Sequence, residues 1–273
     1  MKVGVDVGGT GLRAVVYDNQ YREVKRFFEP WKESKKSKKI QKQLTDFIKK
    51  MHTHGSVGIG LLGSIKNNKI NNAPNAPGLN EMNLAKYVFD NDVNMFAVGE
   101  SKMGAGKPYR NSIYLTLGTG VGGAIVIDKK LYNGKGGAGE FGHMIIIKDG
   151  RKCPCGQKGC LEEYVSVRAV ERLGKKYLRK NMTPLQISEL ALKGNKNAKK
   201  VFQETGEYFG IGLTNLSNIF DPEAIVIGGG LSGSLNLMEK GINKTFKPSM
   251  VVKPKLLKAK LKDPVCMGAA LSL

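Results

Sequence analysis

The sequence lacks any long apolar run. Its apolar stretches all fall short of the roughly 18 residues that a membrane-spanning helix needs. The first residues, Met1–Asp6, pass directly into a strand pattern, without the apolar segment and cleavage site of a signal peptide. We therefore expect a cytoplasmic protein with no membrane partner.

Acidic residues are also scarce. There are 23 Asp and Glu against 44 Lys and Arg, which gives a formal net charge of +21. Basic chains often bind nucleic acid or another polyanion. The lysines are spread out, however, and no RNA-binding or helix-turn-helix signature accompanies them. We favour a solvated basic surface and expect no nucleic-acid partner; polyphosphate stays open as an alternative partner.

Two common nucleotide-binding signatures are missing. The chain has no P-loop, which requires Gly-Lys-Ser/Thr after its glycines, and a strand rather than a helix follows each glycine turn, which disfavours a dinucleotide-binding fold. Glycine itself is abundant, with 35 residues that cluster rather than scatter. Two of these clusters follow predicted strands: Asp6-x-Gly8-Gly9-Thr10 and Gly118–Gly123.

Each glycine cluster is suited to phosphate. A glycine turn lets backbone N–H groups approach phosphate oxygens without a Cβ in the way, and the hydroxyl of Thr10 can add a donor. A carboxylate such as Asp6 is compatible with phosphates through Mg²⁺. A plain hairpin turn is the alternative for either cluster alone, but two such loops could hold a triphosphate from both sides.

The surroundings of the two clusters are alike. VGVDVGGTGLRAVVYDNQ and IYLTLGTGVGGAIVIDKK both run strand, Gly/Thr loop, strand, Asp and polar turn, about 110 residues apart, which indicates a duplicated unit. We expect an α/β protein with two similar domains. Residues 1–107, completed by a C-terminal helix at about 258–273, form the small domain. Residues 108–257 form the large domain, with a zinc knuckle and the nucleotide site.

Periodicity supplies the other elements. Alternating or continuous apolar residues predict strands, and apolar residues three and four apart predict helices. The predicted strands are 2–7, 12–18, 23–28, 56–62, 112–117, 123–127 and 224–227. The predicted helices are 40–51, one that begins at Thr183-Pro184, 201–216 with an end at Asp221-Pro222, and a final one around 268–270.

Cysteine is rare, but three of the four cysteines crowd together. Cys153, Cys155 and Cys160 follow His143 closely, whereas Cys266 stands alone. Three thiolates and one imidazole make a closed tetrahedral zinc site, so we assign it a structural role. Free thiols or a redox centre are the alternatives. Glu140 and Glu162 flank this knuckle and could bind sugar hydroxyls, or they could be solvated surface charges.

Asp92 follows Asn91 at the start of a predicted helix. The carboxylate could be no more than a helix N-cap. It could also be a general base, because phosphoryl transfer commonly uses an Asp that accepts the proton of the attacking hydroxyl.

Taken in order, these motifs resemble the ROK family of repressors and sugar kinases over nearly the whole chain. The matching segments are DVGGTGLR (6–13), APNAPG (73–78), NDVNMFAVGE (91–100), LGTGVGG (117–123), residues 140–143, CPCGQKGCLEEYVS (153–166) and DPEAIVIGGGLS (221–232). The resemblance implies an actin-like (ribonuclease H-like) duplicated fold with two domains around a central cleft, and a homodimer.

The resemblance also implies a role for each matched residue. Asp92 would be the base, and Asp6 would orient Mg²⁺. Sugar hydroxyls would be bound by Gly63, Asn91, Asp92, Glu140, His143 and Glu162. Phosphates would be held by Gly8, Gly9, Thr10 and Thr119, with Gly229 and Gly230 near adenosine. Structural Zn²⁺ would be held by His143, Cys153, Cys155 and Cys160, so that His143 serves both metal and sugar.

The expected activity is therefore ATP:hexose 6-phosphotransferase, of the glucokinase or hexokinase type, with glucose favoured and ATP and Mg²⁺ required. The alternatives are an N-acetylhexosamine kinase or fructokinase of the same family, a kinase that uses polyphosphate, and a non-catalytic sugar-sensing regulator.

Overall fold

The computed structural model describes residues 1–73, 75–249 and 253–273. They form two compact units, which we call the first and the second unit. The first unit comprises Met1–Arg110, Ala124–Ala138 and Ala259–Leu273, and the second comprises Asn111–Gly123 and Gly139–Lys258. Among the described residues, no helix combines the length and the apolar character that crossing a bilayer requires.

The first unit is built on a five-stranded sheet with the order β3-β2-β1-β4-β7. Its strands are β1 (Lys2–Val7), β2 (Gly11–Tyr17), β3 (Glu23–Pro30), β4 (Ser56–Leu61) and β7 (Val88–Asn91). β2 runs antiparallel to its neighbours β1 and β3, and β4 and β7 run parallel to β1. The carboxyl ends of β1, β4 and β7 therefore meet at one edge.

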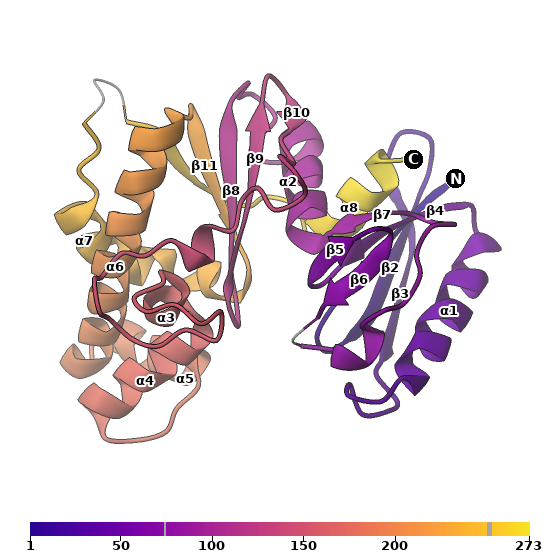
Figure 1. Ribbon diagram of the computed structural model, residues 1–273. Helices are drawn as coiled ribbons and strands as arrows, with labels where there is room; N and C mark the ends of the chain where they lie inside the picture. The colour runs from indigo at the N-terminus through magenta and orange to yellow at the C-terminus, as the bar shows by residue number, and fades with distance from the viewer. Residues whose placement is uncertain (74, 250–252) are drawn as a thin grey trace. The chain divides into compact units, whose positions relative to one another are not determined.

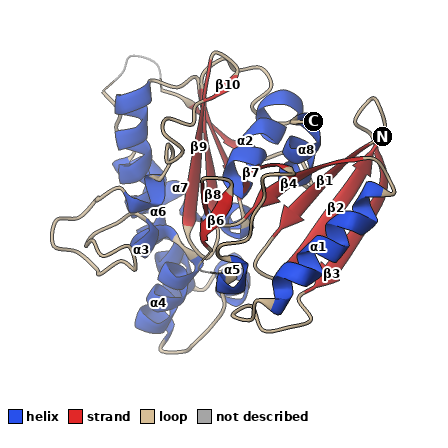
Figure 2. Cartoon of the chain, turned by 45° about the vertical axis from the view of Figure 1, so that its right-hand side comes forward, coloured by secondary structure: helices blue, strands red, loops and turns tan. Residues whose placement is uncertain are grey.

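The two faces of this sheet follow from the alternation in β1. Val3, Val5 and Val7 point to one face and share a core with helix α1 (Lys39–His52), which lies along the sheet in Figure 2. Gly4 points to the other face, where an added Cβ would collide with the carbonyl of Cys266 in helix α8 (Pro264–Leu271). The glycine lets α8 approach the sheet backbone to backbone.

Helix α2 (Asp92–Met103) packs on α8 in the same way, because Gly99 and Gly268 bring the two backbones together. A fully buried carboxylate secures the segment before α8: Glu100 of α2 accepts the N–H groups of Lys260, Leu261 and Ala105. Backbone donors compensate the burial of this carboxylate, whose charge would otherwise be costly to bury. The first unit also contains a two-stranded hairpin, β5 (Ser64–Lys66) and β6 (Lys69–Asn72), and the 3₁₀ helix Pro77–Leu79.

The second sheet has the order β10-β9-β8-β11-β12. Its strands are β8 (Ser112–Leu117), β9 (Val121–Ile127), β10 (Lys130–Leu131), β11 (Ala224–Gly228) and β12 (Lys255–Lys258). β8, β11 and β12 are parallel, so their carboxyl ends also lie at a common edge. The helices of the second unit are α3 (Glu162–Val165), α4 (Val167–Leu178), α5 (Pro184–Leu192), α6 (Lys196–Phe220) and α7 (Leu235–Thr245), as labelled in Figure 1.

Most elements lie where the periodicity of the sequence predicts them. The helix over 40–51, the strand at 224–227 and the helix start at Thr183-Pro184 are confirmed. α6 ends at Asp221, which has a left-handed φ of 42° before Pro222. Eight of the described strands and α-helices were not predicted: β5, β6, β7, β10, β12, α3, α4 and α7. Strands β7 and β12 have only four residues each, which is too short for a periodicity to emerge.

Candidate active site

In the first unit, three of the predicted site segments meet at the carboxyl edge of the sheet. Val7 pairs with Leu61 and Leu61 pairs with Asn91, so the residues that follow these three positions are neighbours. They are the Gly8–Gly11 turn after β1, Gly63 after β4 and Asp92 after β7. In open α/β sheets, ligands bind at this end of the parallel strands.

The Gly8–Gly11 turn closes through a hydrogen bond of 3.0 Å from the Gly8 N–H to the Gly11 carbonyl. Two side chains hold its carbonyl oxygens: the indole of Trp31 donates to Gly8 at 3.0 Å, and Lys35 Nζ donates to Gly9 at 3.1 Å. Thr10 is exposed. Two carbonyl oxygens of the turn are thus hydrogen-bonded within the protein, and Thr10 is accessible to a ligand.

Gly63 and Asn91 are joined. The Asn91 side-chain amide donates to the Gly63 carbonyl at 2.7 Å, and its oxygen accepts the Val93 N–H at 2.8 Å. Gly63 has a φ of +93°, and a Cβ there would collide with the carbonyl of Asn72. Asn91 is therefore the N-cap of α2, and Asp92 is the first residue of the helix rather than its cap.

Asp92 is partly buried, and its carboxylate accepts only a shared bond from Val93, at 3.0 Å, among the hydrogen bonds described for it. Burial, followed by the negative charge of Asp6, raises the pKa of Asp92 from 3.8 to about 7. A base of this pKa is divided between its two protonation states near neutral pH, which is the range in which general bases are most effective.

Asp6 has two charged neighbours that no local sequence pattern singles out, Arg13 and Asp263. Arg13 Nη1 lies 3.6 Å from Asp6 and 3.4 Å from Asp263, and Arg26 also pairs with Asp263. Burial raises the pKa of Asp6 to about 6, with Arg13 opposing this and Asp263 adding to it. Arg13 lies within the first glycine motif, whereas Asp263 is 250 residues further along the chain, so no local signal could have linked the two.

In the second unit, the residues predicted to bind nucleotide come together. β8 and β11 are parallel neighbours, and their carboxyl ends continue into the Gly118–Gly123 segment and into Gly229-Gly230. Gly229 has a φ of +83°, and a Cβ there would collide with the backbone of Leu117. Thr119, at the tip of the loop, is exposed.

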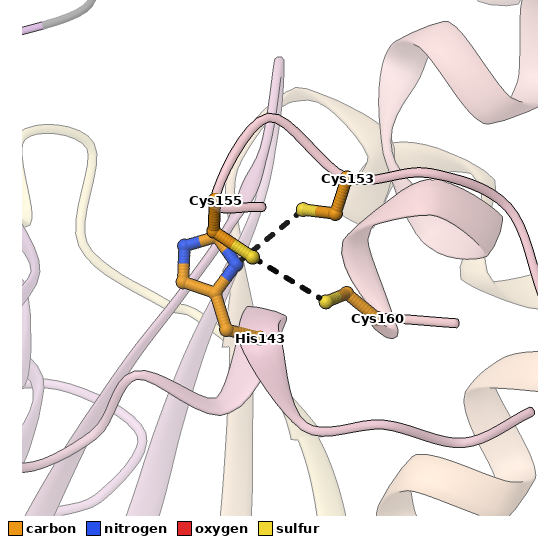
Figure 3. A group of neighbouring side chains, drawn as sticks. All are labelled: His143, Cys153, Cys155 and Cys160. Carbon is orange, nitrogen blue, oxygen red and sulfur yellow. Dashed lines mark hydrogen bonds between the residues drawn. The ribbon is translucent and has the colours of Figure 1, made fainter. Parts of the chain in front are cut away.

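The three cysteines and His143 form one cluster, shown in Figure 3 with all four side chains turned toward one another. Their ligand atoms all lie within 4.8 Å of one another. Cys155 Sγ and Cys160 Sγ are 3.7 Å apart, and Cys153 Sγ is 3.7 Å from His143 Nδ1. Tetrahedral zinc with Zn–S bonds of about 2.3 Å requires S···S and S···N separations of about 3.6–3.8 Å. The cluster therefore fits a zinc ion.

Two further observations support this fit. Gly156 (φ +94°) and Gly159 (φ +82°) make the left-handed turns that bring the thiols together. The ring of His143 directs Nδ1 at the cluster, which leaves Nε2 for another partner. Glu140 is exposed at the start of the same 3₁₀ turn, Phe141–His143.

Glu162, in the same unit, is not a solvated surface charge. Its side chain is only 15% exposed, and Oε2 accepts the Val121 N–H at 3.0 Å while Oε1 lies 3.4 Å from Arg168. The carboxylate is thus held against the loop that carries Thr119.

The two related sheets, each with glycine turns at the ends of its parallel strands, define an α/β protein of the actin-like fold. The fold is shared with solved structures: a ROK family glucokinase from Streptomyces griseus in complex with glucose and AMPPNP (TM-score 0.84, 30% identity, covering 98% of this chain and 97% of that one), and a ROK hexokinase from Thermus thermophilus (TM-score 0.84, 28% identity, covering 100% and 97%). The predicted fold class is therefore confirmed.

The sequence comparisons give the family. The model of the ROK family matches residues 2–271, and the chain belongs to this family. A glucokinase of Streptomyces coelicolor is 34% identical over 92% of this chain and 88% of its own length. A xylose repressor of Bacillus subtilis is 32% identical over 82% and 63%, so enzymes and regulators both occur among the relatives.

Proposed function

We propose that the chain is an ATP-dependent sugar kinase that phosphorylates the 6-hydroxyl of a hexose, with glucose as the favoured substrate. One observation carries this proposal: the Asp92 carboxylate is not the cap of its helix, has a pKa raised to about 7, and follows β7, whose carboxyl end lies at the same edge of the sheet as the Gly8 turn after β1. The similarity to glucokinases supports the choice of sugar.

In this reaction Asp92 accepts the proton of the sugar hydroxyl as that oxygen attacks the γ-phosphate. Phosphoryl transfer needs little covalent chemistry from a protein, so the remaining residues bind and orient. Sugar hydroxyls are bound by Gly63, Asn91, Glu140, His143 and Glu162. Phosphates are held by Gly8, Gly9, Thr10 and Thr119, and adenosine lies near Gly229 and Gly230.

Two metal ions complete the proposal. Asp6 would orient Mg²⁺: burial raises the pKa of this carboxyl to about 6, so a cation beside it would favour the ionised form. Bound Mg²⁺ supplies neutralisation of phosphate charge. Zinc at His143, Cys153, Cys155 and Cys160 would be structural, since four protein ligands leave no open position.

A panel of sugars and phosphate donors with coupled ADP detection tests the activity. We expect ATP- and Mg²⁺-dependent turnover with glucose above N-acetylglucosamine, mannose and fructose. Turnover with N-acetylglucosamine alone would reassign the substrate, and turnover with polyphosphate but not ATP would reassign the donor. Sedimentation of the same preparation tests the expected homodimer.

A sugar-sensing regulator is the second candidate, because xylose repressors match a large part of the chain. It predicts sugar binding in calorimetry without any phosphorylated product. The raised pKa of Asp92 favours the kinase, because a protein that only senses sugar has no need of a carboxylate poised to take a proton near pH 7.

A further inference from the structure

The loop Gly118–Val121 is tied at both ends to the segment that follows Cys160. At one end, the Val167 N–H donates to the Gly118 carbonyl at 2.8 Å. At the other, the Val121 N–H donates to Glu162 Oε2 at 3.0 Å. Between these ties the loop closes on itself, through a bond of 2.9 Å from the Gly118 N–H to the Gly120 carbonyl.

Glu162 also fits the loop sterically. A Cβ added to Gly120 would collide with Glu162 Oε2, and all three of the nearest atoms it would meet belong to the Glu162 carboxylate. The φ of Gly120 lies outside the left-handed region, so the backbone there would accept another residue. The carboxylate occupies the space beside Gly120, so a side chain at position 120 would have to displace it.

The Cys/His cluster is joined to the segment that carries Glu162. Cys160 and His143 both belong to the cluster, and the chain segments next to them are bonded together: the Leu161 N–H donates to the Met144 carbonyl at 2.9 Å, and Ile145 forms a β-bridge with Cys160. Helix α3 begins at Glu162, two residues after Cys160. The ligand cluster, α3 and the loop are thus one continuous set of contacts within the second unit.

We propose that Glu162 is a positioning residue for the phosphate-binding loop, and that the metal knuckle thereby sets the affinity for nucleotide and not only the wall of the sugar site. This inference rests on the proposed kinase function. It is compatible with a sugar contact by the same residue, since a carboxylate offers about four lone-pair sites and the chain occupies two of them. A carboxylate suits the position because a charge-assisted bond to a backbone N–H is about twice as strong as a neutral one.

Calorimetric titration with Mg²⁺-AMPPNP in the absence of sugar tests the proposal, since neither sugar binding nor turnover enters the measurement. We expect Glu162→Ala to weaken AMPPNP binding about tenfold or more, because the loop loses its tie at Val121. Glu162→Gln keeps an acceptor and should weaken it less. Glu189→Ala makes the same chemical change at an exposed residue of α5 and should leave the affinity unchanged.

A double-mutant cycle separates positioning from any general loss of structure. Gly120→Ala pushes the carboxylate away and should weaken AMPPNP binding about as much as Glu162→Ala, while the double variant should be no weaker than either single one. If Glu162→Ala does not fold, Gly120→Ala carries the test alone, since it retains Glu162. Protein stripped of metal by a zinc-selective chelator should also lose affinity for AMPPNP.

Wild-type affinity for AMPPNP in Glu162→Ala, with only glucose affinity reduced, would overturn the inference and leave Glu162 as a sugar ligand. Additive losses in the double variant would also overturn it. Unchanged AMPPNP affinity after removal of the metal would remove the knuckle from the proposal. Failure of the kinase function has a different signature: wild-type protein that binds neither AMPPNP nor sugar, or that binds both without forming product.

Discussion

The glycine turns of the two units have the same local pattern but are supported in different ways. In the first unit, Trp31 and Lys35 donate to the carbonyls of the Gly8–Gly11 turn, and the nearby carboxylates of Asp6 and Asp92 have raised pKa values. In the second unit, the carboxylate of Glu162 accepts a loop N–H and is paired with Arg168. The carboxylates beside the first turn have raised pKa values and can take up a proton or a cation. The carboxylate beside the second turn already accepts a hydrogen bond from the loop.

This difference assigns separate tasks to two copies of one pattern. A partly buried carboxylate without enough compensating donors is costly for stability and useful for chemistry. A carboxylate that accepts a backbone N–H and faces an arginine is satisfied, and it serves to fix a conformation. We therefore expect damage in the first unit to affect the chemical step, and damage in the second to affect binding and folding.

The largest effect is expected from Asp92→Asn, which removes the proposed base but keeps the shape of the side chain. We expect kcat to fall by about three orders of magnitude, the middle of the range for general acid–base catalysis, while glucose affinity stays within a few-fold. Coupled ADP release and calorimetry measure the two quantities. Asp46→Asn is the matched control, because Asp46 is an exposed residue of α1 in the same unit. A kcat within tenfold of wild type would refute the role of Asp92.

The second effect concerns the metal. We expect about one zinc per chain by elemental analysis, and Cys153→Ser or prolonged chelation should abolish it and lower the free energy of unfolding by more than about 3 kcal/mol, since metal binding energy is folding energy. Cys266→Ala is the control, because this buried cysteine lies in α8 of the first unit. It should keep the zinc. A stable, metal-free wild-type preparation would contradict the assignment.

The third effect compares two glycines with nearly the same φ in different units. Gly63 has a φ of +93° and Gly194 a φ of +94°, but a Cβ at Gly63 collides with Asn72 while one at Gly194 meets nothing within 4 Å. Gly194→Ala should cost about 1 kcal/mol from backbone strain alone. Gly63→Ala should cost roughly 2–4 kcal/mol and also raise the KM for sugar, because Asn91 donates to its carbonyl. Equal losses in urea unfolding would show that the collision relaxes.

The smallest effect is a pH dependence centred on Asp92. The base acts when deprotonated, so kcat/KM should rise with pH through about 7, and Asp6→Asn should move this midpoint to lower pH by removing a neighbouring negative charge. A pH–rate profile measures both. An unmoved midpoint in Asp6→Asn would show that the two carboxyls do not interact.

The same pKa shift predicts a dependence of stability on pH, with the opposite sign to the usual one for carboxyls. The pKa of Asp92 is higher in the folded state than in the unfolded state, so its contribution is fully present below about pH 4 and is lost as pH rises to about 7. Nucleotide-free Asp92→Asn should therefore be more stable than wild type at pH 8, by roughly 1–3 kcal/mol. Equal unfolding curves at pH 5 and pH 8 for the two proteins would contradict the raised pKa.

The sequence predicted much of the candidate site because its signals are local. Cys153-x-Cys155 with Gly156 and Gly159 predicts a tight ligand turn, since thiols so close in the chain need only left-handed glycines to converge. The Asn91-Asp92 pair predicted a helix start, but could not say which of the two side chains caps it. That choice depends on the donation of the Asn91 amide to Gly63, which lies 28 residues away.

By itself, then, the sequence determined the repeated strand–turn–strand units, the family and the set of residues in the Cys/His cluster, because each of these depends on residue types at short, fixed spacings. Only the tertiary structure decided the charge around the proposed base and the task of Glu162. Arg13 and Asp263 lie 250 positions apart in the chain, and Val121 and Glu162 lie 41 positions apart, yet each pair is in contact. Electrostatic and hydrogen-bond energies depend on distances in space, and no spacing along the chain encodes them.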